Sequence, residues 1–276
     1  MKDIVVNSET KAQLENDGFA VVPFLNSEEL NALQHFYSEV QASNFIEFFN
    51  SMHMTTFSAN EERKFYIKGV LEKLLSEPTK RTFKNCRMLN NIFIIKQANS
   101  GGYFNMHSDW SVVDESQFAS YNVWIPLQDT QLENGTLWVI KGSHKLNMPH
   151  RGGGKLLHMF NYSYNDVKDK ATIIPLKAGE AVLFNLKTIH GSFPNSTNQN
   201  RCISSFTVIP TEAPLQISFQ ENESSPLLLI EPQDDFMYRY SNILTQSNQQ
   251  PPNGRLIASL PNFTVALPSL NDILSI

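Results

Sequence analysis

The stretch YNVWIPLQDTQLENGTLWVIKGSH, residues 121–144, contains two short apolar runs that are separated by a polar turn. Tyr121–Leu127 and Leu137–Lys141 are rich in β-branched and aromatic residues, which favour strands. Glu133-Asn134-Gly135 lies between them and is a typical turn sequence. The stretch therefore predicts two strands that follow each other closely along the chain.

Similar runs occur on both sides of this stretch, from Asn91 onward. They are Ile92–Gln97, Thr172–Leu176, Ala181–Asn185 and Ile203–Ile209. Many short strands separated by turns are typical of a β-sandwich or barrel, of which the double-stranded jelly roll is one form. Further along, Leu227–Ile230 and Phe263–Leu267 are strand candidates, and the polar segment Gln246–Gly254 is predicted to be an exposed loop.

The first third of the chain is predicted to be mostly helical. Thr10 and Gln13 can form a capping box at the start of a first helix. A later helix is predicted over Glu61–Ser76, because Pro78 follows it and proline ends or kinks helices. Helices gathered at one end of the chain are expected to brace one sheet of the β-structure.

The simplest domain organisation is a single catalytic domain over residues 1–276. We expect a helical part, residues 1–90, to brace a β-core of about residues 91–210, with residues 211–276 as a C-terminal extension. The sequence shows no internal repeat and no low-complexity block that would indicate a second domain.

Composition excludes several classes of function. The formal net charge is −5, which argues against binding to nucleic-acid phosphates. The sequence has no apolar run of about 18 residues, so no membrane span is predicted. The first residues lack the apolar block of a signal peptide, and the two cysteines are far apart in sequence, so a cytoplasmic protein with reduced thiols is expected. The partner that remains is a small-molecule substrate.

His107-Ser108-Asp109 is a candidate for two ligands of one metal ion. Residues two apart on a strand project to the same face, which would place an imidazole beside a carboxylate. A third ligand must come from elsewhere, and His190, just past the predicted strand Ala181–Asn185, is the best candidate. Two histidines and one carboxylate form the facial triad of non-haem Fe(II) oxygenases, which leaves three coordination positions open.

Arg201 and Ser192 are candidates for binding a carboxylate beside that metal. A turn through Pro194-Asn195 would bring the strand that begins near Arg201 back beside His190. A guanidinium group pairs bidentately with a carboxylate, such as the distal one of 2-oxoglutarate, and a serine hydroxyl can add a hydrogen bond. An arginine in a solvated ion pair at a strand end is the competing interpretation.

With these motifs in order, the sequence resembles the phytanoyl-CoA dioxygenase family of Fe(II)/2-oxoglutarate-dependent oxygenases. The matching stretches are Met106–Trp110, Asn122–Leu127, Glu133–His144, Ala178–Phe184 and His190–Asn195, followed by Arg201. Asp17–Leu25 is also similar to the opening strand of the family. The resemblance covers roughly residues 17–210, and beyond Pro210 there is no match.

This resemblance implies a double-stranded β-helix, a cupin-like jelly roll that is mainly β with flanking helices. It implies that Fe(II) is bound by His107, Asp109 and His190, with 2-oxoglutarate and O₂ as co-substrates. Arg201 and Ser192 match the binders of the 2-oxoglutarate carboxylate, and Trp124 matches an aromatic residue that lines the co-substrate pocket. The implied reaction is hydroxylation of an unactivated C–H bond of a small-molecule or lipid-like substrate, with release of succinate and CO₂.

Three other functions remain open on the sequence. Halogenating members of the family have Gly or Ala in place of Asp109, so this carboxylate argues for hydroxylation. A zinc hydrolase could use the same three ligands and a bound water, but Arg201 has no obvious role in it. A cupin-like binding module without catalysis is the third alternative.

The glycine run after Arg151 is predicted to be a flexible loop over the mouth of the site, able to act as a lid. It is no phosphate-binding loop, because Lys155 is followed by Leu156 instead of Ser or Thr. Arg151 or Lys155 could meet an anionic group of the substrate there, although such charges are usually solvated.

Overall fold

The structure is a computed structural model, and it describes residues 4–43, 46, 48, 51–156, 160–240 and 253–276. Its N-terminal part is helical, as predicted, with helices α1 (Ser8–Asp17), α2 (Ser27–Ala42) and α3 (Glu61–Thr82).

Helix α1 begins one turn earlier than predicted. The side chain of Asn7 accepts a hydrogen bond from the main-chain N of Thr10 at 2.9 Å, so Asn7 is the N-cap. The predicted capping box of Thr10 and Gln13 is wrong, because Thr10 already lies inside the helix. The helix ends at Gly18, which takes up the left-handed conformation with φ 83°.

Helix α3 continues past Pro78, where the sequence predicted its end. The apolar face of the helix includes Ile67, Leu71 and Leu75, which are all at most 3% exposed, and Pro78 is buried on the same side. Packing of this face stabilises the helix enough to offset the hydrogen bond that proline cannot make. The main-chain N of Phe83 donates to Thr79 O at 2.7 Å and closes the last turn.

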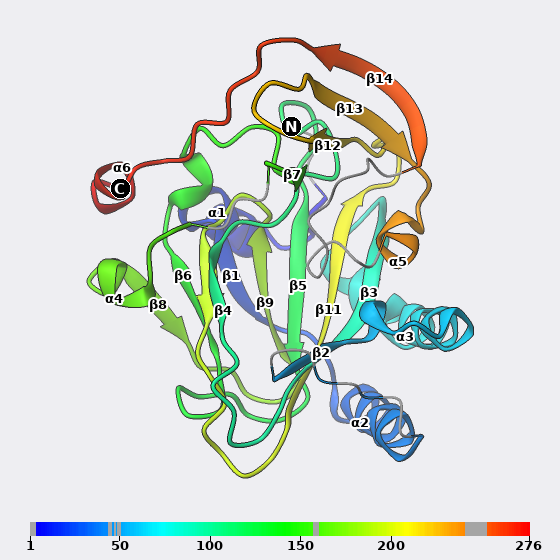
Figure 1. Ribbon diagram of the computed structural model, residues 1–276. Helices are drawn as coiled ribbons and strands as arrows, with labels where there is room; N and C mark the ends of the chain where they lie inside the picture. The colour runs from blue at the N-terminus through cyan, green and yellow to red at the C-terminus, as the bar shows by residue number, and fades with distance from the viewer. Residues whose placement is uncertain (1–3, 44–45, 47, 49–50, 157–159, 241–252) are drawn as a thin grey trace.

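Two antiparallel sheets face each other in the middle of the molecule (Figure 1). The larger sheet has the order β1 (Phe19–Pro23), β9 (Glu180–Asn185), β5 (Tyr121–Pro126), β11 (Arg201–Pro210), β3 (Cys86–Lys96) and β2 (Met52–Met54). The smaller sheet has the order β4 (Phe104–His107), β10 (His190–Ser192), β6 (Leu137–Ile140) and β8 (Ala171–Ile174). This arrangement confirms the predicted jelly roll, mainly β with flanking helices.

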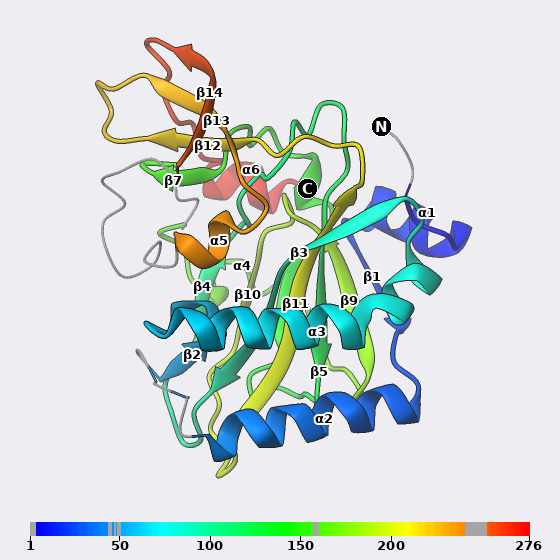
Figure 2. The same cartoon turned by 90° about the vertical axis from the view of Figure 1, so that its right-hand side faces the viewer.

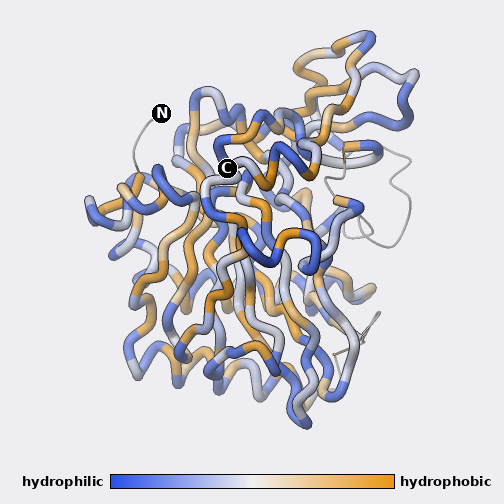
Figure 3. Tube along the Cα trace, turned by 90° about the vertical axis from the view of Figure 1, so that its left-hand side faces the viewer, coloured by the Kyte–Doolittle hydropathy of each residue, from blue (hydrophilic) through white to orange (hydrophobic). Residues whose placement is uncertain are grey.

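The two faces of the larger sheet are covered differently. One face packs against the smaller sheet, and Val139 and Ile174 meet Val182, Phe184 and Ile203 there in one buried cluster. The other face is covered by α2 and α3, which run side by side across it (Figure 2). Figure 3 shows that the strands in the interior are largely hydrophobic and that the turns at their ends are hydrophilic.

The strand candidates of the central region are confirmed with small changes of boundary. Ile92–Gln97 belongs to the longer strand β3, and Ile203–Ile209 belongs to β11. The short strands β4 and β10 were not among the candidates, although they carry the two predicted histidine ligands.

A third sheet lies at the C-terminal end, in the order β14 (Gly254–Leu260), β13 (Leu227–Pro232), β12 (Ile217–Gln220) and β7 (Gly152–Gly154). Strand β13 confirms the candidate Leu227–Ile230. The candidate Phe263–Leu267 is not a strand, and the main-chain carbonyl of Phe263 accepts instead from the side chain of Gln220 at 2.9 Å. Most of the predicted loop Gln246–Gly254 lies outside the described residues, and its last residue begins β14.

Short elements complete the described structure. They are η1 (Thr55–Phe57), η2 (Ser143–Lys145), α4 (Tyr164–Val167), α5 (Phe236–Arg239) and α6 (Leu270–Leu274). Among the helices in the described ranges, none is long and apolar enough to cross a membrane.

Candidate metal centre and co-substrate pocket

His107 and His190 lie directly opposite each other on the paired strands β4 and β10. Their ring centroids are 4.2 Å apart. The Nδ1 atom of His107 lies 2.7 Å from the carbonyl oxygen of Asn105, and that of His190 lies 2.9 Å from Thr188 O. Because a carbonyl oxygen only accepts, each Nδ1 carries the hydrogen and each Nε2 is left with a free lone pair. Both rings therefore present the nitrogen that a metal ion needs.

The carboxylate of Asp109 completes the group. Its Oδ1 lies 3.8 Å from His107 Nε2 and 3.9 Å from His190 Nε2. The three side chains offer ligand atoms that all lie within 4.8 Å of one another, which fits a single metal ion. The spacing suggested that Asp109 lies on the same strand as His107. In the structure, Asp109 instead follows the end of β4.

The charge state of His107 also suits a metal ligand. Burial, and then the neighbouring ring of His190, lower the pKa of His107 to about 4. At neutral pH the imidazole is therefore uncharged, as metal coordination requires.

Asn122 fixes the orientation of the Asp109 carboxylate. Its Nδ2 donates to Asp109 Oδ2 at 3.0 Å, and its own Oδ1 accepts from the hydroxyl of Ser205 at 2.8 Å. Oδ2 is therefore occupied, and Oδ1 is the oxygen that faces the two histidines. The sequence analysis matched Asn122 to the family without giving it a role. A signal that could have indicated its role is that Asn122 is the one amide in the strand YNVWIP. The other five residues of this strand are buried.

Arg201 is a buried cation with unused donors. The side chain is 1% exposed, and one terminal nitrogen donates to Gly135 O at 3.1 Å. No described residue accepts a hydrogen bond from its Nε or its other terminal nitrogen, which is rare for buried polar atoms and indicates a missing acceptor. Burial lowers the pKa of Arg201 to about 10, so it remains charged at neutral pH. A carboxylate of a ligand would supply the acceptor and the compensating charge.

Trp124 lies beside this cation, and Ser192 contacts Lys96, the strand partner of Arg201. The guanidinium carbon of Arg201 is 5.4 Å from the centroid of the Trp124 ring. Ser192 is two residues after His190 on β10, so both side chains project to the same face. The metal ligand and the expected co-substrate binder are therefore neighbours on one strand.

Lys96 is a second buried cation here, and the sequence analysis missed it. Its Nζ donates to the hydroxyl of Ser192 at 2.8 Å and also contacts Phe193 O. Lys96 is paired with Arg201 across β3 and β11. Burial, and then the charge of Arg201, hold the pKa of Lys96 well below its usual range. Among the described residues, neither cation forms an ion pair with a carboxylate.

Arg151 and the glycine run are not where the sequence placed them. Gly152–Gly154 form strand β7 and pair in parallel with β12, so the prediction of a flexible loop is wrong. The Arg151 side chain is fully buried and forms an ion pair with Glu115, so it is not available to a substrate.

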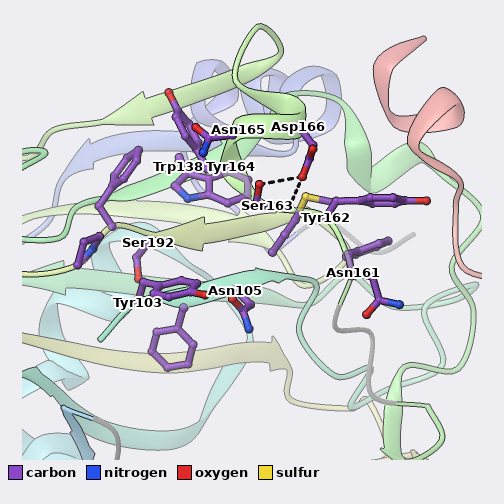
Figure 4. Close-up of a pocket in the computed structure, with 15 residues that line it drawn as sticks. Tyr103, Asn105, Trp138, Asn161, Tyr162, Ser163, Tyr164, Asn165, Asp166 and Ser192 are labelled. Atoms are coloured by element: carbon purple, nitrogen blue, oxygen red, sulfur yellow. Dashed lines mark hydrogen bonds between the residues drawn. The ribbon is translucent and has the colours of Figure 1, made fainter. Parts of the chain in front are cut away.

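A pocket of about 700 Å³ lies at the smaller sheet, and Ser192 is among the residues that line it (Figure 4). Met106 and Trp138 line it, and both point away from the histidines because neighbouring strand residues alternate in direction. Tyr164 packs edge-on against Trp138, with ring centroids 5.6 Å apart. The one acidic side chain in the lining, Asp166, already accepts from the main-chain N and hydroxyl of Ser163. None of the three expected metal ligands lines this pocket, but Ser192, the expected co-substrate binder, does.

Comparison with known proteins gives a family match and several structural neighbours. The profile of the phytanoyl-CoA dioxygenase (PhyH) family matches residues 14–203. A phytanoyl-CoA dioxygenase of Arabidopsis thaliana is 32% identical over 129 residues, which are 45% of this chain and 45% of that protein. The chain thus matches about half the length of this relative.

Solved structures with the same fold include two proteins with bound ligands. The epimerase SnoN, solved with Fe³⁺, α-ketoglutarate and a nogalamycin compound, superposes with a TM-score of 0.57 at 16% identity. That match covers 75% of this chain and 84% of SnoN. HygX of Streptomyces hygroscopicus, solved with nickel and 2-oxoglutarate, has a TM-score of 0.54 at 18% identity, over 75% of this chain and 88% of HygX.

Proposed function

Because the chain belongs to the phytanoyl-CoA dioxygenase (PhyH) family, we propose that it is a non-haem Fe(II)/2-oxoglutarate-dependent dioxygenase. The expected reaction is hydroxylation of an unactivated C–H bond of a small-molecule or lipid-like substrate, with release of succinate and CO₂. Bound iron would supply O₂ activation at positions that the protein leaves open.

His107, Asp109 and His190 would hold the iron. The histidines present Nε2 atoms from one pair of strands, and Asp109 presents Oδ1 because Asn122 occupies Oδ2. Three protein ligands leave room for a bidentate 2-oxo acid and for O₂. The single carboxylate also leaves no ligand position for a halide once both co-substrates are bound, which favours hydroxylation over halogenation.

The observation that carries the proposal is the buried guanidinium of Arg201, which has two nitrogens without an acceptor among the described residues and is linked through Lys96 and Ser192 to the strand of His190. With Ser192 and Lys96 it forms a cluster of two basic side chains and a hydroxyl, which suits a dicarboxylate such as 2-oxoglutarate. Trp124 would line the same pocket. The mechanism of a zinc hydrolase assigns no role to these basic side chains. A binding module without catalysis would not require an open metal position beside them. Both alternatives are therefore less favoured.

We also propose that residues 1–276 act as one catalytic domain. Pairing of β12, from the C-terminal extension, with β7 supports this organisation, since β7 lies within the family match. A cytoplasmic location remains a prediction from the sequence.

Succinate release is the direct test of the proposed activity. The protein should be loaded anaerobically with Fe(II) and then supplied with 2-oxoglutarate, O₂ and a metabolite extract. We expect succinate to form, together with products that are heavier by one oxygen atom. Zinc-loaded protein is the control and should form neither. Absence of succinate from iron-loaded protein that binds both Fe(II) and 2-oxoglutarate would contradict the proposal.

A further inference from the structure

The main chain of Asp109 is held by a contact from outside the two facing sheets. Asp109 follows the end of β4, so no strand ladder fixes its backbone. Its main-chain carbonyl accepts a hydrogen bond from Arg151 Nε at 2.7 Å. Arg151 lies 42 positions further along the chain, so this bond joins two segments that are distant in sequence.

The guanidinium group of Arg151 is fully committed to the protein. One terminal nitrogen donates to Glu115 Oε1 at 2.6 Å. The other donates to Glu115 Oε2 and to Met148 O, each at 2.8 Å. The side chain is 0% exposed, and a bidentate arginine–carboxylate pair has little freedom to rotate. The hydrogen bond to Asp109 therefore comes from a donor with a fixed position.

The backbone of Arg151 holds the same loop at a second point. Its carbonyl oxygen accepts from the main-chain N of Ser111 at 3.0 Å and from the hydroxyl of Ser111 at 2.9 Å. Arg151 thus contacts the segment 109–111 at both of its ends. A shift of Arg151 would move Asp109 with it.

The C-terminal sheet determines where Arg151 lies. Residues Gly152–Gly154 follow it directly and pair with β12. A Cβ atom at Gly152 would lie 1.9 Å from the carbonyl oxygen of Ser218, and one at Gly154 would lie 2.0 Å from that of Gln220. Only glycine permits this approach of the two strands. Strand β12 lies beyond residue 203, where the family match ends.

We propose that Arg151 is a positioning residue for the metal ligand Asp109, and that the C-terminal sheet acts on the metal centre through it. The proposal rests on the assignment of the metal site in the proposed function. Asn122 holds the carboxylate of Asp109 and Arg151 holds its peptide group, so together they fix the ligand at two points. Outer partners of this kind change metal affinity by about 10–100-fold in metalloproteins.

A double variant tests the proposal without leaving a buried charge unpaired. Arg151→Met combined with Glu115→Met replaces the ion pair by apolar side chains, a change that buried pairs often tolerate. The control is Arg87→Met with Asp234→Met, which removes a more exposed arginine–carboxylate pair. Arg87 also donates to a main-chain carbonyl, that of Ala213, but this pair contacts none of the three metal ligands.

Co(II) binding by calorimetry, the visible spectrum of the bound Co(II) and the melting temperature of the metal-free protein are measured for each variant. We expect the Arg151/Glu115 variant to bind Co(II) about 10–100-fold more weakly, with a changed spectrum and a melting temperature close to wild type. The control should bind Co(II) as wild type does. Wild-type affinity and spectrum in a folded Arg151/Glu115 variant would overturn the proposal.

Two further variants keep the test decisive if the double variant does not fold. Arg151→Lys retains the charge but cannot make the forked contacts, so we expect a smaller loss of Co(II) affinity and a partial spectral change. Gly152→Val should weaken Co(II) binding by separating β7 from β12. Wild-type Co(II) affinity in folded Arg151→Lys would refute the role of Arg151, and the same result in Gly152→Val would refute the role of the C-terminal sheet. If wild-type protein itself bound no Co(II), the proposed metal site would fail instead.

Discussion

The two histidine ligands and the aspartate ligand are positioned by different means. His107 and His190 are register partners on adjacent strands, and each ring is oriented by a carbonyl within two residues of it. Asp109 lies outside the strands and depends on Asn122 and Arg151, which come from elsewhere in the chain. The histidines are therefore positioned by strand pairing and by their own neighbouring carbonyls, whereas the aspartate depends on the side chains of two other segments. We therefore compare substitutions that remove a metal ligand with substitutions that remove a residue supporting one. The two kinds should differ in their effect on metal binding and turnover.

Loss of a histidine should have the largest effect. His107→Ala and His190→Ala should each lose Fe(II) and abolish 2-oxoglutarate turnover while the fold remains intact, because nothing local replaces the missing nitrogen. Iron content after desalting, succinate formation and circular dichroism measure the three properties. Wild-type iron occupancy and turnover in either variant would show that the triad is wrongly assigned.

Loss of the aspartate should inactivate the enzyme with a different signature. Asp109→Gly leaves both histidines in place and opens a position for chloride. Transfer of chlorine also depends on how the substrate radical is aimed at the metal, so we expect mainly inactivity, with chlorination at most a minor product. Wild-type protein should give a hydroxylated product, labelled from ¹⁸O₂, and no chlorinated product even in high chloride. Mass spectrometry of the products checks both. An unlabelled or chlorinated wild-type product would contradict the hydroxylase assignment.

Substitution of Arg201, which lies on strand β11, tests the binding of 2-oxoglutarate. Arg201→Ala should weaken 2-oxoglutarate binding by ~2–4 kcal/mol, because a buried carboxylate loses its charge-assisted partner. Arg201→Lys should restore only part of this loss, since a point charge cannot reproduce the fork. Calorimetry with a metal ion present measures the affinity. Unchanged affinity in Arg201→Ala would exclude this role.

The smallest effect is expected at the support of the Asp109 carboxylate. Asn122→Ala removes the donor to Oδ2 and should weaken metal binding by about tenfold, the low end of the range for outer partners. Ser205→Ala, which only frees the acceptor of Asn122, is the matched comparison and should have less effect. Metal titration of both variants decides the order. If both variants bound the metal ion with wild-type affinity, Asp109 would need no such support.

The same difference explains how much of the site could be predicted from the sequence. His107, Asp109 and His190 are brought together as expected, and the unsatisfied donors of Arg201 fit its predicted role. These residues lie in short motifs with a regular relation to strands and turns. Lys96, Glu115 and the role of Asn122 were missed, because no short motif marks them and each acts through a side-chain contact that only the folded chain makes.

The errors in the fold prediction have a related cause. Proline and glycine were judged by their intrinsic preferences, which tertiary packing overrides at Pro78 and at Gly152–Gly154. Three consecutive glycines have little tendency to form a strand alone. They form one here by pairing closely with β12, whose carbonyl groups leave no space for a side chain at positions 152 and 154. Such a constraint becomes visible only when both strands are placed together.

The close approach of β7 to β12 has an evolutionary consequence. A side chain at position 152 or 154 would collide with a main-chain carbonyl, which no rotamer change can relieve. A relative that builds the same C-terminal sheet must therefore retain both glycines, whereas a relative that lacks this sheet is free to lose them. The glycine pair is thus a marker in the sequence for an inherited architecture, and saturation mutagenesis should find both positions nearly invariant.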